Sequence, residues 1–316
     1  MKEKVIKVIA FFAILALILG VLTFIFIPKN NTEKAGMYNV EANGILGERK
    51  DTIDIVVVGN SESFTSIIPM KIWKDCGYTT YLCGTASQTT AKAVKMAYRA
   101  TKDQKPKLMI FETDAIFCEK PVTEAIEKVI EYNFPLIEYH DRWKNLNSQD
   151  FYKRRKHTWT DYMKGYDYSN ATAGIDDSNY MTYSEEKQPI TKINKLCVKI
   201  LKEYCKKNNI QFLLLSTPNL KNWDYKKHNA VKEFADQEQI EFIDLNVLQD
   251  EVDIDWNLDT KDTGNHLNYY GALKVTEYLE EYLKNKNIFE DHREDEKYEK
   301  WNKALKRYEE RIKNKE

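Results

Sequence analysis

The sequence predicts an α/β protein, a three-layer parallel sheet with flanking helices, which follows an N-terminal transmembrane helix. Two observations predict the sheet: short runs of β-branched and other apolar residues recur along the chain, and helical periodicities lie between several of them. Alternating strands and helices are typical of parallel sheets, whose strands are buried on both faces. A third observation, a long uncharged run near the N-terminus, predicts the membrane helix.

The composition is that of a packed globular protein. Of the 316 residues, 42% are hydrophobic, and 48 Lys and Arg stand against 49 Asp and Glu, which gives a formal net charge of -1. This balance excludes a strongly basic nucleic-acid-binding protein. The length allows one large domain or two small ones.

The first apolar segment is long enough to cross a membrane. Residues 8–28 carry no charge, and a helix of that length rises about 1.5 Å per residue, enough for a hydrocarbon layer of about 30 Å. A cleaved signal peptide is the alternative, but the run is long for one and offers no small-residue cleavage site. Lys2, Lys4 and Lys7 precede the run, which favours a cytoplasmic N-terminus and an extracytoplasmic domain in the cell membrane.

Five apolar runs are the predicted strands. They occupy residues 53–58, 79–83, 108–111, 212–215 and 241–243. Helical periodicity marks the stretches between several of them, at residues 90–101, 191–208 and 226–237. A further amphipathic helix runs to about Lys284.

The chain divides into regions of different character. We expect a membrane anchor at 1–28, a polar stalk at 29–50, the α/β domain at 51–289 and a charged helical tail at 290–316. An excursion at about 112–189, rich in Tyr, Trp, Asn and Asp, interrupts the strand and helix alternation. Because such long excursions are usually functional, we interpret it as an insertion near the site.

Two features leave alternatives open. In the tail, a 3-4 spacing puts five apolar residues on one helical stripe, which either packs on its own domain or docks a partner: Tyr298, Trp301, Leu305, Tyr308 and Ile312. The odd number of cysteines favours free or buried thiols over a disulfide framework. These cysteines are Cys76, Cys83, Cys118, Cys197 and Cys205.

Polar residues that follow the first strand are the first candidates for chemistry, since ligands of open α/β sheets bind beyond the carboxyl ends of the strands. Gly59, Asn60 and Ser61 come directly after that strand. Gly59 permits a tight turn, and Ser61 would then expose its hydroxyl and turn its own N–H toward a developing oxyanion. The same three residues also form ordinary turns.

A serine nucleophile needs a neighbouring base, most often a histidine that a carboxylate orients. Of the five histidines, His266 is the best placed, in a polar loop just before the last amphipathic helix of the domain. Asp262, four residues earlier, can fold back to bond the imidazole. The alternative interpretation is a solvated loop histidine. His140 lies in the insertion and is a second candidate for lining a pocket.

Together, the turn at 59–61 and the loop at 262–272 resemble the first and last sequence blocks of the SGNH, or GDSL-type, hydrolases. They are most similar to the membrane-anchored extracytoplasmic acyltransferase branch, which includes the D-alanyl-transfer protein of lipoteichoic acid and the alginate O-acetylation proteins. Further matches lie at 66–69, at 81–84 with Gln88, and at 106–107. The resemblance covers roughly residues 54–283 and implies an SGNH-like, flavodoxin-like fold.

The resemblance also implies roles. Ser61 is the nucleophile, His266 the general base and Asp262 its orienting partner, with Asp259 in reserve because three residues, where the family usually has two, separate Asp262 from His266. For the oxyanion, Gly84 matches the family's glycine N–H donor. The family's asparagine block is missing after the third strand, so Gln88 is the candidate for the third donor.

What the resemblance implies for function is a serine O-acyltransferase or esterase that modifies a glycopolymer of the cell envelope. A multi-span membrane O-acyltransferase is the implied partner, and neither metal nor organic cofactor is needed. An alternative from another class is a catalytically silent, membrane-anchored glycopolymer-binding protein. A glycosidase that uses two carboxyl groups is a weaker hypothesis, because the sequence shows no pair of acidic residues whose separation in the fold can be inferred.

Overall fold

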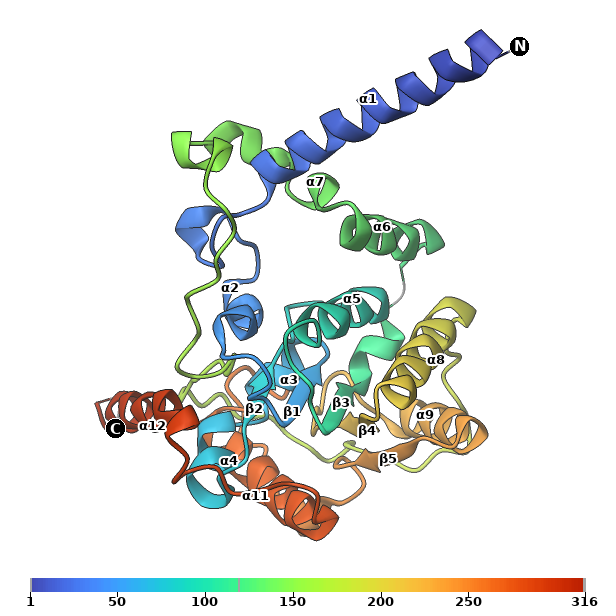
Figure 1. Cartoon of the computed structure of the whole chain (residues 1–316). Coiled ribbons are helices and arrows are strands. Elements are labelled where there is room, and N and C mark those ends of the chain that lie inside the picture. Colours follow the sequence, from blue (N-terminus) through green and yellow to red (C-terminus); the bar gives the residue numbers. More distant parts are fainter. Residues whose placement is uncertain (1, 119, 315–316) are drawn as a thin grey trace.

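A parallel five-stranded sheet forms the centre of the computed structural model, which describes residues 2–118 and 120–314 (Figure 1). The strands lie in the order β2-β1-β3-β4-β5, and every neighbouring pair is parallel. They are β1 (Ile55–Val58), β2 (Thr80–Leu82), β3 (Leu108–Glu112), β4 (Gln211–Ser216) and β5 (Glu241–Asp244). The predicted fold class is confirmed, and each strand lies within the predicted run or within a residue or two of it.

Helices cover both faces of the sheet and complete the three layers (Figure 1). On one face α4 (Pro69–Cys76) contacts α11 (Tyr269–Lys286), and on the other α5 (Thr90–Ala100) contacts α8 (Lys192–Lys207). At the edge, α9 (Tyr225–Glu238) packs on β5. Because both faces are covered, all residues of β1, β2 and β3 are buried, as their near-continuous apolarity predicts.

The other helices lie at the two termini and between the elements of this frame. The remaining α-helices are α1 (Lys2–Phe26), α2 (Val40–Asn43), α3 (Ser61–Thr65), α6 (Val122–Asn133), α7 (Pro135–Glu138), α10 (Gln249–Val252) and α12 (Glu299–Lys313). Short 3-10 helices are η1 (Glu33–Ala35), η2 (Gly44–Gly47), η3 (Thr113–Phe117), η4 (His140–Asn145), η5 (Ser148–Phe151) and η6 (Glu296–Tyr298). All five cysteines are free thiols.

The N-terminal helix α1 extends away from the rest of the fold (Figure 1). It is long and apolar enough to cross a membrane, and its described residues are exposed or half-buried. The segment that follows, expected as a stalk, is folded onto the domain. Asn31 is fully buried and donates from Nδ2 to the carbonyls of Asn43 (3.1 Å) and Trp159 (2.5 Å), while Ala42 and Ile45 join the core.

Different parts of the excursion at 112–189 lie in two places on the molecule. Its start, at Asp114, Phe117 and Cys118, lines the pocket described below, and so does Asp167 further along. Its middle lies at the end of α1, where α7, η4 and η5 contact that helix and Arg142 donates from Nη1 to the carbonyl of Phe26 (2.5 Å). Among the described residues of the excursion, those that line the site are therefore its first residues and Asp167.

The C-terminal stripe packs on its own domain. Trp301 is buried, and the centre of its ring lies 5.4 Å from that of Trp73 on α4. The ring centre of Tyr298 lies 6.1 Å from that of Trp73. Tyr308 and Ile312 are buried as well. Of the two sequence alternatives, the structure shows the intramolecular one.

Candidate active site

The turn that leaves β1 places Ser61 at the first position of α3, at the carboxyl end of the sheet. Asn60 is the N-cap of this short helix, and its side-chain oxygen accepts a hydrogen bond from the N–H of Glu62 (3.3 Å). A pocket of about 630 Å³ opens there. Its lining includes Ser61, Asp262 and His266, and the fold thus brings Ser61 to a loop about 200 residues later in the sequence.

Two glycines let the chain pass through this turn. A Cβ at Gly59 would lie only 2.6 Å from the Cβ of Glu112 on β3, and the backbone φ of Gly59 is +155°. A Cβ at Gly84 would lie 3.0 Å from the carbonyl oxygen of Asn60 and would collide with Ser63. Gly84 therefore lies against the turn. It lines an adjoining cavity, and Phe64 lines both that cavity and the pocket.

Gln88 stabilises the turn through hydrogen bonds of its side-chain amide. Its Oε1 accepts the N–H of Gly59 (3.0 Å), and its Nε2 donates to the carbonyl of Cys83 (3.3 Å) and to Thr85 Oγ1 (3.2 Å). The side chain is fully buried. These contacts direct the Gln88 amide to the backbone of the turn, so the structure does not place it as the third oxyanion donor.

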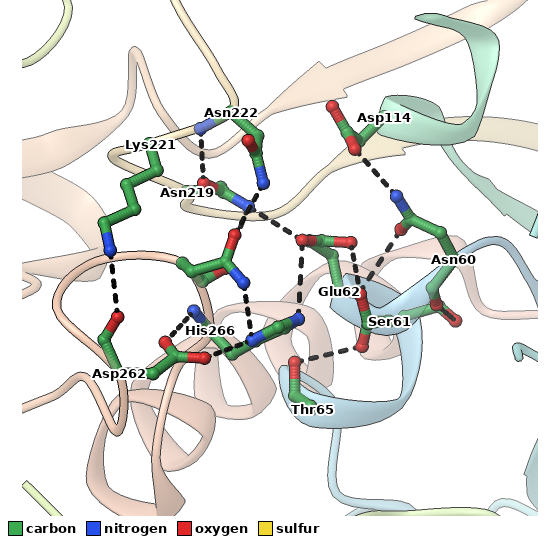
Figure 2. A network of polar contacts seen from close by, with 12 residues as sticks. Asn60, Ser61, Glu62, Thr65, Asp114, Asn219, Lys221, Asn222, Asp262 and His266 are labelled. Carbon is green, nitrogen blue, oxygen red and sulfur yellow. Dashed lines mark hydrogen bonds and ion pairs between the residues drawn. The ribbon is translucent and has the colours of Figure 1, made fainter. Parts of the chain in front are cut away.

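Asp262 holds the His266 imidazole (Figure 2). Its Oδ2 lies 2.5 Å from Nδ1 of the ring, and its Oδ1 accepts the backbone N–H of His266 at 2.7 Å. Partial burial raises the pKa of Asp262, but these hydrogen bonds outweigh it and hold the pKa below its usual range. The reserve candidate, Asp259, lies elsewhere and accepts from Asp255 N–H (2.8 Å) and Lys274 Nζ (2.7 Å).

The other imidazole nitrogen faces the centre of the site. When Nδ1 carries the proton that Asp262 accepts, Nε2 is the acceptor nitrogen of the ring. Among the described residues Nε2 of His266 has no hydrogen-bond partner although it is buried, and the nearest carboxyl oxygen is Glu62 Oε1 at 3.9 Å. The ring therefore has a free acceptor inside the site.

Glu62 connects the serine with the histidine (Figure 2). Its Oε2 accepts the Ser61 hydroxyl (3.2 Å), while Oε1 accepts Asn219 Nδ2 (2.8 Å) and faces His266. Burial and, after it, the charge of Asp114 raise the pKa of Glu62 to about 7, against the opposing hydrogen bonds from Ser61 and Asn219. Glu62 was not singled out from the sequence, in which only its position next to Ser61 could have indicated it.

A second carboxyl group, that of Asp114, also contacts the turn. Asp114 accepts from Asn60 Nδ2 (2.7 Å) and pairs with Lys227 of α9 at 3.0 Å. Behind it, burial and the neighbouring charge of Glu62 raise the pKa of Glu112 well above its usual value. Among the described residues, no group of three or more His, Cys, Asp or Glu side chains is arranged to hold a metal ion.

The other histidine candidate, His140, lies elsewhere. It is exposed in η4, where its Nδ1 contacts the carbonyl of Ile137 (2.7 Å), and it lies outside the pocket that Ser61 lines. Asn219, Asn222 and Lys227 come from the loop after β4 and from α9 and were missed by the sequence analysis. No local motif marks them, since only the fold brings them to Ser61.

Comparisons with known proteins give structural neighbours only. The sequence matches no protein-family model and no curated protein. Solved structures that align include a GDSL-like lipase from Bacteroides thetaiotaomicron, with 14% identity over 73% of this chain and 88% of that chain (TM-score 0.38). An esterase, EstA, from Pseudoalteromonas sp. has 8% identity over 74% and 98% (0.40), and a lipase/acylhydrolase from Enterococcus faecalis has 10% over 74% and 97% (0.37).

The raised pKa of Glu62 predicts a pH-dependent stability. Between pH 4.5 and about 7 the folded protein keeps a proton that the unfolded chain releases, so Glu62 makes stability fall as pH rises through this range. The Glu62→Gln variant has no such carboxyl group, so this decrease in stability with rising pH is absent from it. We expect the free energy of unfolding of the variant, minus that of the wild type, to increase by about 3 kcal/mol from pH 4 to pH 8, at 1.36 kcal/mol per pKa unit.

Denaturant unfolding at several pH values measures this difference. Glu185→Gln, which changes an exposed carboxyl, is the matched control and is expected to show no such pH dependence. A Glu62→Gln difference that stays constant from pH 4 to pH 8 would mean that Glu62 ionises normally in the folded protein.

Proposed function

We propose that the protein is an extracytoplasmic serine esterase or O-acyltransferase in which Ser61 forms an acyl-serine. One observation carries the proposal: a serine hydroxyl, a free imidazole nitrogen and a carboxylate on the opposite ring nitrogen meet in one pocket. A serine needs such a histidine to act as a nucleophile at neutral pH, and the histidine needs the carboxylate to keep its basic nitrogen inward.

In the proposed reaction, the Ser61 hydroxyl leaves its hydrogen bond to Glu62 and donates to Nε2 of His266. Oγ then forms a bond to the acyl carbonyl carbon while Nε2 takes the proton, and Asp262 stabilises the imidazolium. The C–O bond to the leaving alcohol breaks, and the alcohol departs with the proton from Nε2. A second hydroxyl or a water then takes the acyl group from Ser61 by the reverse steps.

The oxyanion needs donors close to Ser61. The Ser61 N–H stands at the first position of α3, where helical N–H groups have no acceptor within the helix. The second proposed donor is the Gly84 N–H, which the resemblance implies and whose residue lies against the same turn. Gln88 is left out of the proposal because its amide serves the turn.

The acceptor and the location are further parts of the proposal. Its support is α1, together with the resemblance of the two motifs to the membrane-anchored branch of the SGNH hydrolases. We propose a single-pass protein with a cytoplasmic N-terminus that acts on a glycopolymer of the cell envelope. A multi-span membrane O-acyltransferase is the proposed donor of the acyl group.

One contact favours the alternative, a catalytically silent glycopolymer-binding protein. In the structure the Ser61 hydroxyl is bonded to Glu62 and not to His266. Hydrogen bonds of catalytic serines are often loose without substrate, and for that reason we retain the enzyme as the conclusion.

If His266 is the base, His266→Ala is expected to lower turnover of an activated acyl ester by about three to four orders of magnitude. The thermal midpoint is expected to change little, because a loop histidine contributes little packing. His140→Ala, an exposed histidine outside the pocket, is the control and is expected to keep wild-type turnover. A fall in stability that accounts for the lost activity would instead make His266 a structural residue.

The acceptor is tested in cells. Mass analysis of envelope polymers is expected to show loss of an acyl ester when Ser61→Ala replaces the wild type at equal abundance. Ser87→Ala, which removes another hydroxyl from the same pocket, is expected to retain the ester. Unchanged acylation in the Ser61→Ala cells would remove the glycopolymer from the proposal, whatever the esterase assay shows.

A further inference from the structure

The helix α6 presents an apolar face that the rest of the fold leaves open. One side of the helix packs on α5, and Glu131 there pairs with Lys95 at 2.5 Å. On the other side Val122, Ile126 and Val129 follow the spacing of a single helical face, and each is more than half exposed. Amphipathic helices of soluble proteins normally turn this face inward, so the exposed face needs a partner.

More exposed apolar side chains continue from α6 toward α1. They are Phe134 and Ile137 at α7, Trp143 in η4, and Phe151 with Tyr152 at η5, with Trp143 62% exposed and Tyr152 65%. The elements α7, η4 and η5 all contact α1. In Figure 1, α7 and the turns after it lie beside the end of α1 that meets the domain, and α6 adjoins α7.

A basic run completes this surface. Lys153, Arg154, Arg155 and Lys156 are consecutive and all exposed. The N–H of Lys156 donates to the carbonyl of Lys29 (2.9 Å), three residues beyond the end of α1. The run is therefore held at the point where the apolar helix ends. We call residues 122–156 the interfacial surface.

We propose that the interfacial surface lies on the bilayer that α1 crosses, with its apolar side chains at the headgroup level and residues 153–156 on anionic headgroups. Three observations support a lipid partner. The exposed apolar helix face, the exposed Trp and Tyr, and the basic run are each typical of membrane interfaces. They are also continuous with α1, whose apolar surface is itself uncovered. The proposal rests on α1 as a membrane helix and is independent of the role of Ser61.

This contact would fix the domain on the membrane. A single helix leaves the domain free to rotate and tilt, whereas a second contact through α6 and η5 holds one orientation. The pocket would then keep a constant position relative to the bilayer.

Fluorescence quenching by brominated lipids tests the contact. The full-length protein and its Trp143→Phe variant are reconstituted in vesicles of phosphatidylcholine and phosphatidylglycerol, and the difference between their emissions reports Trp143 alone. We expect brominated acyl chains to remove most of this difference signal. A difference signal that bromination leaves unchanged would overturn the proposal, and docking to a protein partner would give that result, because the vesicles contain no other protein.

The charge contribution is tested by a quadruple variant, Lys153→Gln, Arg154→Gln, Arg155→Gln and Lys156→Gln. We expect it to reduce Trp143 quenching in phosphatidylglycerol vesicles to the level that the wild type shows in pure phosphatidylcholine. The matched control changes four exposed cations of α12, which lies far from α1 in Figure 1: Lys300→Gln, Lys306→Gln, Arg311→Gln and Lys313→Gln. Equal loss in both variants, or loss in neither, would contradict a headgroup contact of residues 153–156.

Discussion

The turn from β1 into α3 has no space for a side chain at its entry, and the geometry of the site depends on this constraint. Gly59 passes against Glu112 of the neighbouring strand, its N–H is held by the buried Gln88, and Gly84 closes the turn from the other side. Because β1 is buried on both faces, the turn cannot shift along the sheet. Ser61 is therefore placed by backbone packing, which costs little reorganisation when a substrate binds.

Burial of several carboxyl groups beside this turn sets the electrostatics of the site. Asp114 has Lys227 and Asp262 has His266 as partners. The side-chain hydrogen bonds to Glu62 from the described residues come from neutral groups, Ser61 and Asn219, and His266 Nε2 lies 3.9 Å away. Burial and the nearby Asp114 charge consequently raise the pKa of Glu62 toward neutrality. The same carboxyl holds the Ser61 hydroxyl, so the protonation state of Glu62 and the availability of the nucleophile are linked in the proposed mechanism.

Sequence patterns predicted the parts of the molecule that depend on local order. The strands and flanking helices follow from apolar runs and helical periodicity, and the short Asp262 to His266 spacing allowed the contact that the structure shows. Asn219 and Lys227 escaped prediction because only packing between distant segments brings them to the pocket of Ser61. Glu62 is adjacent to Ser61 in the sequence, but its burial and its contact with Asn219 arise only in the fold. Residues 29–50 looked like a stalk by their polarity, yet buried Asn31, Ala42 and Ile45 tie them to the domain.

Covalent labelling of the full-length protein with a serine-directed fluorophosphonate tests the central claim most directly. The account predicts one adduct by intact mass, mapped to Ser61, absent in Ser61→Ala and retained in Ser87→Ala, which lines the same pocket. His266→Ala is expected to slow the labelling strongly, since Ser61 would lose its base. A folded protein that takes up no label, or takes it up at a serine other than Ser61, would contradict an activated Ser61 and leave the silent binding protein as the better account.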